Sequence, residues 1–435
     1  MSYQQVDLVE VRAWGELVGA VALDPATEFY AFEYDNDWIA RGKSLAPLQM
    51  PNRPGVFEFP QLAPDTYYRL PAMLADALPD KFGNALVNAY LADQGVPSEA
   101  ITPLDRLAYA SDRGMGALTF HPPLQDGVQT STAVQLADLV SAARAMVSGE
   151  ISTAPAIHDA LHQLIQVGTS AGGARAKAVI AYNPVTGQIR SGQFDAPVGF
   201  EHWIVKLDGV TVDLNREFDP LTAGTDYGRV EYAYYLMASS SGVEMSECQL
   251  LPEGPRTHFL TRRFDRTSEG RRIHLQSLCA LAHLDFNLTN THSYSQYFAT
   301  IRELGLGLDA IKQAFRRMVF NVVAVNRDDH TKNLAFLLPE NDSWQLAPAY
   351  DVTHSHNSRS KWTQRHQMGV NGKFDGITLA DLREVGDRQQ VPSYGSVIEE
   401  VLTAIDRWPE FAHSAGVSDQ TLERIAKDMD ENRPR

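Results

Sequence analysis

The sequence has few cysteines and no long apolar segment. Cys248 and Cys279 are the only cysteines among 435 residues, and each lies in a partly apolar segment, so we expect buried free thiols rather than a disulfide. No stretch approaches the roughly 18 consecutive apolar residues of a membrane span. The opening residues, MSYQQVDLVE, lack the basic end and apolar run of a signal peptide. We therefore expect a cytoplasmic protein with no membrane partner.

Positive charge is also scarce. The chain has 38 Lys and Arg against 54 Asp and Glu, a net charge of −16. Such a surface repels nucleic-acid phosphates, so direct binding of DNA or RNA is not expected, whereas a basic protein partner would be attracted. The hydrophobic content of 44% is ordinary for a globular protein, and the length suffices for two or three domains.

The N-terminal third alternates between strand and helix patterns. Residues 5–35 carry three runs of alternating apolar residues, which predict three strands with a tight turn at Trp14-Gly15. Residues 66–95 have helical spacing with a break at Pro79-Asp80, and residues 113–116 predict a turn into another strand. The polar segment 121–132 is the best candidate for a domain boundary.

A loop of small residues follows two predicted helices, one after Thr132 and one after Pro155. Residues 168–177, GTSAGGARAK, lead into a predicted strand at 178–182. Backbone N–H groups in such a loop can approach a polyphosphate closely, although a plain flexible turn fits the pattern about equally well. It is not a Walker A loop, because no Gly-Lys-Ser/Thr opens a helix here. The candidate nucleotide-binding residues are Gly172, Gly173, Ala174, Arg175 and Lys177.

Lys206 lies in the apolar strand HWIVKL. Because a buried lysine needs a partner, Glu231, one turn inside a helix predicted from Gly228 to about Ser241, could hold its ammonium group on a nucleotide phosphate. The strand pattern by itself is explained equally well by a lysine on an edge strand that faces water. Glu231 could likewise only complement the helix dipole.

The most informative stretch is NRDDHTKN, residues 326–333. An amphipathic helix from about Leu308 to Val325 leads into it, with an apolar stripe on one face. A strand at 334–338, a turn at 339–342 and a second strand then form a hairpin whose open end brings Asp351, 18 residues on (351 − 333), beside Asn333. Carboxylate and amide oxygens suit Mg²⁺ with a nucleotide phosphate.

Taken in order, these parts are typical of a protein-kinase-type phosphoryl transferase that uses ATP and Mg²⁺. Lys206 would bind phosphates, Asn333 and Asp351 would hold Mg²⁺, and Asp328 would accept or orient the proton of the substrate hydroxyl. His330 is expected to pack the loop rather than act as a base. Asp329 should point away from Asp328 into a salt bridge or cap. A metal pair of His354 and His356 with Asp351 is not favoured, because a third soft ligand is missing.

The chain resembles the HipA-like serine/threonine kinases, the toxins of bacterial toxin–antitoxin pairs, over essentially its whole length. The N-terminal motifs that match are WGELVG, LPDKFGNALV and DRGMGALTF. The kinase motifs are SAGGARAK, HWIVKL, VEYAYYLMA, RRFDR, NRDDHTKN and APAYDV. The last two, with their 18-residue separation (351 − 333), are the most specific.

The resemblance implies roles for individual residues. It makes Asp328 the catalytic aspartate, Asn333 and Asp351 the Mg²⁺ ligands, and Lys206 the ATP-binding lysine. Ser170 matches the serine whose autophosphorylation inactivates family kinases, which is reasonable because a phosphate there would repel ATP. The hinge, with Arg262 and Phe264, would contact the nucleotide, and Arg262 stands where the family often has Glu. Ala176 replaces a frequent Pro or Glu.

The resemblance also implies an α+β fold, with a small β-rich N-terminal domain followed by an atypical kinase-like core and a helical C-terminal lobe. We place the divisions at 1–125, 126–265 and 266–435. The implied partners are a helix-turn-helix antitoxin of the HipB type, through which alone DNA would be contacted, and a translation component such as glutamyl-tRNA synthetase. A kinase of another protein or of a small metabolite outside such a pair, and a pseudokinase scaffold, stay open as alternatives. A metal-dependent phosphoesterase is less favoured, because it leaves Lys206 unexplained.

Overall fold

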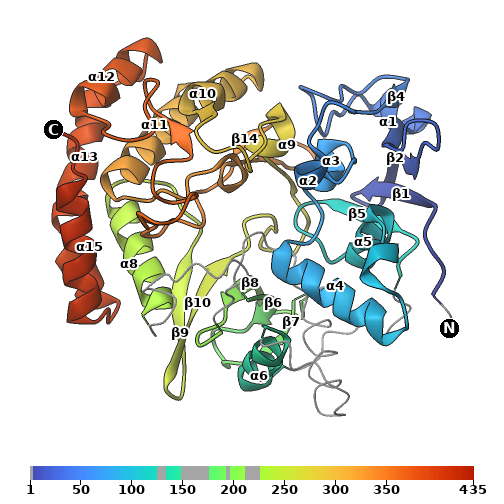
Figure 1. Ribbon diagram of the computed structural model, residues 1–435, viewed down its shortest axis with the longest axis horizontal. Helices are drawn as coiled ribbons and strands as arrows, with labels where there is room; N and C mark the ends of the chain where they lie inside the picture. The colour runs from blue at the N-terminus through green and yellow to red at the C-terminus, as the bar shows by residue number, and fades with distance from the viewer. Residues whose placement is uncertain (1–2, 125–133, 148–175, 193–195, 211–225) are drawn as a thin grey trace. The chain divides into compact units, whose positions relative to one another are not determined.

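The computed structural model describes residues 3–124, 134–147, 176–192, 196–210 and 226–435 (Figure 1). The chain divides into two compact units. One comprises Met1–Arg216, Leu251–Gln276 and Leu338–Asn341, and the other comprises Glu217–Leu250, Ser277–Leu337 and Asp342–Arg435. The first is rich in strands and the second is mainly helical, which confirms the predicted α+β class. The three-part division at 125 and 265 stays a prediction.

The three strands predicted near the N-terminus are confirmed. They are β1 (Leu8–Ala13), β2 (Glu16–Leu23) and β3 (Tyr30–Tyr34), and with β4 (Val56–Phe57) and β5 (Leu118–His121) they form an antiparallel sheet in the order β4-β3-β2-β1-β5. Trp14 and Gly15 close the first hairpin with φ of 53° and 84°. Positive φ at both turn positions matches the right-handed twist of the flanking strands.

The helical pattern over residues 66–78 is only partly realised. The chain forms two short helices, α2 (Pro64–Tyr67) and α3 (Ala72–Ala75), because Tyr68 and Arg69 between them have φ of 55° and 61°. The break at Pro79-Asp80 is confirmed, since the Asp80 carboxylate caps α4 (Lys81–Asp93) by accepting from the Gly83 N–H at 2.7 Å. The other helices before β5 are α1 (Asn36–Arg41) and α5 (Pro103–Ala110).

A second five-stranded sheet has the order β7-β6-β8-β10-β9. Its strands are β6 (Lys177–Tyr182), β7 (Ile189–Ser191), β8 (Glu201–Lys206), β9 (Cys248–Glu253) and β10 (Arg256–Arg262). Phe82 and Leu86 of α4 belong to the same buried cluster as Trp203 and Val205 of β8, together with α6 (Leu136–Val147). The N-terminal region therefore supplies part of the core beneath this sheet.

The helical unit is built around α11 (Leu308–Val323), which packs against α10 (Tyr294–Glu303) and α13 (Tyr394–Asp406) (Figure 1). The predicted apolar stripe of α11 is confirmed as core, since Phe315, Met318 and Val319 are fully buried. The remaining elements are α8 (Tyr227–Ser240), β11 (His274–Ser277), α9 (Leu278–Ala282), β12 (His292–Ser293), β13 (Ala335–Leu338), β14 (Gln345–Leu346), β15 (Met368–Gly369), α12 (Leu379–Arg388), α14 (Trp408–Ser414) and α15 (Asp419–Glu431).

Cys248 and Cys279 are buried free thiols, as the sequence predicts. Within the described ranges, no helix is long and apolar enough to cross a membrane.

Candidate active site

The loop after α11 is fixed at its start by backbone contacts. Val325, with φ of 55°, turns the chain out of the helix, and the Asn326 N–H donates to the Asn321 carbonyl at 2.9 Å. The Arg327 N–H donates to the Ser355 carbonyl at 3.1 Å, and the Ser355 N–H donates to the Val325 carbonyl at 3.2 Å. A β-branched residue at positive φ is strained, so these bonds hold a conformation that the chain would not adopt alone.

The predicted hairpin brings the candidate metal ligands together. Strand β13 pairs antiparallel with β14, with Phe336 opposite Leu346. Asp328, Asn333 and Asp351 line one pocket of the helical unit, which has about 400 Å³ of space when the solvent at its mouth is counted. The Asn333 amide Nδ2 donates to the Asp328 carbonyl at 2.9 Å, and the Asp328 side chain is 46% exposed. The other lining residues are Val243, Arg317, Phe320, Asn321, Asn326, Asp329, Leu334, Ala349, Tyr350 and Val352.

The donor set fits a hard divalent cation. Because Asn333 Nδ2 already donates to a carbonyl, the amide oxygen Oδ1 is the atom left to face a cation, and Asp351 adds a carboxylate. Asp351 has φ of 52°, and Tyr350 before it donates its hydroxyl to the Lys332 carbonyl at 2.7 Å. Across the described part of the chain, no three His, Cys, Asp or Glu side chains form a metal cluster. An amide oxygen and a carboxylate are oxygen ligands of the kind that Mg²⁺ favours.

Asp329 has a different environment from Asp328. Its side chain is fully buried and accepts from the Tyr294 hydroxyl at 2.9 Å and the Gln367 N–H at 2.8 Å, while His366 Nδ1 lies 3.1 Å away. Burial, together with this carboxylate, raises the pKa of Tyr294 well above its usual value of 10.0, so the phenol keeps its proton and donates it. Asp329 thus fastens the loop to the segment that carries His366 and Gln367.

The neighbouring histidines have structural contacts. His330 Nε2 lies 3.7 Å from Asp328 Oδ1, and its ring packs against Phe286 with centroids 5.5 Å apart. His354 and His356 both face Asp428 Oδ2 of α15, at 3.1 Å and 3.5 Å. These contacts agree with a packing role for His330, and they give His354 and His356 a shared carboxylate neighbour, Asp428.

The candidate nucleotide residues of the strand-rich unit are only partly described. Ser170, Gly172, Gly173, Ala174 and Arg175 lie outside the described residues. Lys177 and Lys206 are cross-strand neighbours on β6 and β8, and Lys206 Nζ lies 5.5 Å from the centre of the Phe259 ring on β10. Lys177 is buried at 4% exposure. The two ammonium groups concentrate positive charge at this end of the sheet.

Two further predicted contacts stay predictions. Glu231, on α8 and 2% exposed, belongs to the helical unit, whereas Lys206 belongs to the strand-rich unit. Arg262 at the end of β10 forms an ion pair with Glu201, 3.2 Å between Nη2 and Oε1, and Phe264 after it is half-buried. The roles of Arg262 and Phe264 at the nucleotide are not tested by these contacts.

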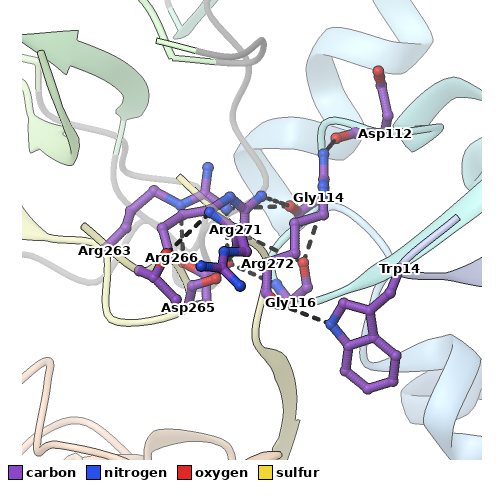
Figure 2. Close-up of polar contacts among 10 residues, drawn as sticks. Trp14, Asp112, Gly114, Gly116, Arg263, Asp265, Arg266, Arg271 and Arg272 are labelled. Atoms are coloured by element: carbon purple, nitrogen blue, oxygen red, sulfur yellow. Dashed lines mark hydrogen bonds and ion pairs between the residues drawn. The ribbon is translucent and has the colours of Figure 1, made fainter. Parts of the chain in front are cut away.

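Asp265 organises a charged cluster that sequence reasoning did not identify (Figure 2). The carboxylate is fully buried and accepts from Arg263 Nη2 at 2.7 Å, Arg266 Nη1 at 2.6 Å and the Gly116 N–H at 2.7 Å. Burial alone would raise the pKa of Asp265, but the two guanidinium groups outweigh it and hold this pKa well below its usual range. Both arginines also donate to the Gly114 carbonyl, at 3.2 Å and 3.3 Å.

The cluster joins two motifs that are 149 residues apart in sequence (263 − 114). Arg272 extends it by donating to the carbonyls of Gly116 and Asp112, and its own carbonyl accepts from Trp14 Nε1 at 2.9 Å. The RRFDR and DRGMG motifs are therefore parts of one structural feature. Its signal in the sequence was an aspartate flanked by arginines within the RRFDR motif.

Comparison with known families identifies the class of protein. The HipA N-terminal domain family matches residues 9–121, and the HipA-like C-terminal domain family matches residues 169–434. The second match alone covers more than half of the chain. The protein therefore belongs to the HipA-like family.

The similarity to one curated protein covers a smaller part of the chain than the family matches do. The chain is 30% identical over 138 residues to Y4dM of Sinorhizobium fredii (strain NBRC 101917 / NGR234), whose name presents it as a candidate kinase. That match covers 28% of this chain and 32% of Y4dM, so the chain spans about a third of the curated relative's length.

Among solved structures, the chain is similar to Shewanella oneidensis MR-1 HipA, determined in a complex with HipB and operator DNA. The TM-score is 0.66 at 16% identity, covering 98% of this chain and 95% of that one, which establishes a shared fold. A Helicobacter pylori proinflammatory kinase, CtkA, gives a TM-score of 0.33 at 14% identity over 53% of this chain and 86% of its own. That score is too low to relate the folds.

Proposed function

We propose that the protein is an ATP- and Mg²⁺-dependent protein serine/threonine kinase. The observation that carries the proposal is the convergence of Asp328, Asn333 and Asp351 on one pocket, in a chain that belongs to the HipA-like family. Phosphoryl transfer requires positioned phosphates, neutralised charge and an oriented nucleophile. Asp328 would orient the nucleophile, and Asn333 and Asp351 would hold the Mg²⁺ that neutralises charge.

The proposed roles follow from the environment of each side chain. Asp328 is half-exposed and accepts or orients the proton of the substrate hydroxyl. Asn333 Oδ1 and the Asp351 carboxylate would hold Mg²⁺, which when bound would neutralise phosphate charge. Lys206, beside Lys177 on the sheet, binds the phosphates, with residues 172–175 as the loop that covers them.

We further infer that the kinase is a cytoplasmic toxin held in check by an antitoxin. The support is the fold shared with Shewanella oneidensis MR-1 HipA, whose structure contains HipB and operator DNA. The proposed partner is a helix-turn-helix protein, and the net charge of −16 favours contact with DNA through that partner alone. The proposed substrate is a translation component such as glutamyl-tRNA synthetase, and phosphorylation of Ser170 would inactivate the enzyme.

Phosphoproteomics of a cell lysate tests the substrate class. Lysate incubated with ATP, Mg²⁺ and the protein should gain phosphorylated Ser or Thr in one or a few proteins, and an Asp351→Ala control should not produce them. The same spectra should show phosphate on Ser170 of the wild type. An Asp328→Gln protein that still phosphorylated Ser170 would contradict the role of Asp328.

A further inference from the structure

Arg317 is a buried cation in the pocket of Asp328, Asn333 and Asp351. It lies on α11, four residues before Asn321 (321 − 317), so both side chains project from the same face of the helix. Both line the pocket, and Arg317 is 4% exposed. An arginine in this position had no part in the sequence-based account of the site.

The guanidinium group of Arg317 is poorly satisfied within the protein. Its only hydrogen bond among the described residues runs from Nη1 to the Tyr297 hydroxyl at 3.5 Å. Nε and Nη2 are buried and find no hydrogen-bond partner in the described part of the chain. None of the ion pairs between described residues includes Arg317. A buried guanidinium with two unpartnered donors and no direct ion pair is costly, so its retention calls for an explanation.

The adjacent residue provides a contrast. Arg316 is also buried, but it donates to the Ser241 carbonyl and forms an ion pair with Glu400 of α13, 2.5 Å between Nη1 and Oε2. Arg316 does not line the pocket. Nε of Arg316 is buried without a hydrogen-bond partner, as in Arg317, but only Arg316 has an ion pair among the described residues. Of the two neighbouring arginines, only Arg317 lines the pocket.

The ligand that would satisfy the hydrogen-bond donors of Arg317 is an anion that is itself coordinated to a cation. Asp328 and Asp351 line the same pocket, and their negative charge would repel a bare anion. A phosphate group coordinated to a divalent cation meets both requirements, since the cation faces the carboxylates and the phosphate oxygens face the guanidinium. Guanidinium groups suit this task because their planar donors match phosphate oxygens.

We propose that Arg317 is a phosphate-binding residue, which contacts the phosphoryl group transferred from Mg²⁺-bound nucleotide. This inference rests on the proposed kinase function and adds to it a positive group from the helical unit. Bound to the phosphate oxygens, Arg317 neutralises the negative charge that gathers on them during transfer. The interaction is electrostatic, from the guanidinium donors to the phosphate oxygens.

The test compares Arg317→Met with Arg316→Met and Arg317→Lys. Three quantities are measured: the melting temperature without ligand, the affinity for Mg·ATP and for Mg·tripolyphosphate, and kcat. We expect Arg317→Met to keep or raise the melting temperature, because it removes a buried guanidinium that has two unpartnered donors and no direct ion pair. It should also weaken binding of both phosphate ligands and lower kcat about 100-fold. Arg317→Lys should recover part of both losses.

The control separates function from structure. Arg316→Met should lower the melting temperature, because Glu400 and the Ser241 carbonyl lose their partner, and leave phosphate affinity unchanged. If Arg317→Met instead lowers the melting temperature and leaves affinity and kcat at wild-type values, Arg317 is structural and the inference is wrong. If the wild-type protein itself neither binds Mg·ATP nor transfers phosphate, the proposed kinase function fails as well.

Discussion

The side-chain amide of Asn333 donates to the backbone carbonyl of Asp328, with 2.9 Å between Nδ2 and O. This bond couples the proposed proton acceptor to the proposed metal ligand within one loop. It also orients the amide, because the oxygen Oδ1 must then face away from that carbonyl. Asn333 would therefore help to set both the position of Asp328 and the direction of its own proposed metal ligand, Oδ1.

Asn333→Asp tests this coupling. A carboxylate is the stronger Mg²⁺ ligand, but it has no N–H to donate and would place an oxygen against the Asp328 carbonyl. We expect a loss of about 1–3 kcal/mol in the positioning of the loop, and hence a kcat lower by about 10- to 100-fold. The measurement is steady-state phosphoryl transfer at saturating Mg²⁺. Activity equal to the wild type would show that this hydrogen bond has no role.

Asp328 and Asp329 form a matched pair for separating chemistry from stability. Asp328→Ala should abolish transfer and change the free energy of unfolding by less than about 0.5 kcal/mol, because the side chain is 46% exposed. Asp329→Ala removes a buried acceptor from Tyr294 and the Gln367 N–H and should cost about 3 kcal/mol. Urea unfolding of the two variants measures the difference. Equal destabilisation would contradict the assigned roles.

Local patterns in the sequence predicted the helical and hairpin parts of the site. The stripe of Phe315, Met318 and Val319 repeats at helical spacing, and the hairpin follows from alternation around a turn, so both depend on neighbouring residues. The division into two short helices, α2 and α3, could not be predicted. The apolar pattern does not indicate that Tyr68 and Arg69 have positive φ.

The long-range contacts of the site could not be predicted from local sequence patterns. The bond between His366 and Asp329 joins residues 37 positions apart, and no local rule predicts it. The Asp265 cluster required knowing that residues 114–116 lie beside residues 263–266. The place of Arg317 in the site was the contact most open to prediction from sequence. A charged residue on the same helix face as Asn321 interrupts the apolar pattern there.

Asp265 should make folding sensitive to acid. Its pKa is held below the unfolded value of about 3.9. Its stabilising contribution is therefore complete above about pH 4 and is lost as pH falls further. Asp265→Asn should cost about 3–5 kcal/mol at pH 7, because two buried guanidinium groups lose their counter-charge.

Urea unfolding of the wild type and Asp265→Asn between pH 7 and pH 3 checks this linkage. The difference in unfolding free energy should be constant near neutrality and shrink below about pH 4. Asp65→Asn, at an exposed position of the same unit, provides the control and should have little effect at any pH. A difference for Asp265→Asn that did not change with pH would contradict the ionic account of the cluster.

The central claim is that the pocket of Asp328, Asn333 and Asp351 transfers the terminal phosphate of ATP. Parallel reactions with [γ-³²P]ATP and [α-³²P]ATP, in the presence of Mg²⁺ and of lysate protein, test it most directly. We expect protein-bound label from the γ position only, and this label should disappear without Mg²⁺ and in the Asp328→Gln and Asp351→Ala variants. The absence of any label, while ATP still raises the melting temperature of the wild type, would contradict the account and identify a nucleotide-binding scaffold.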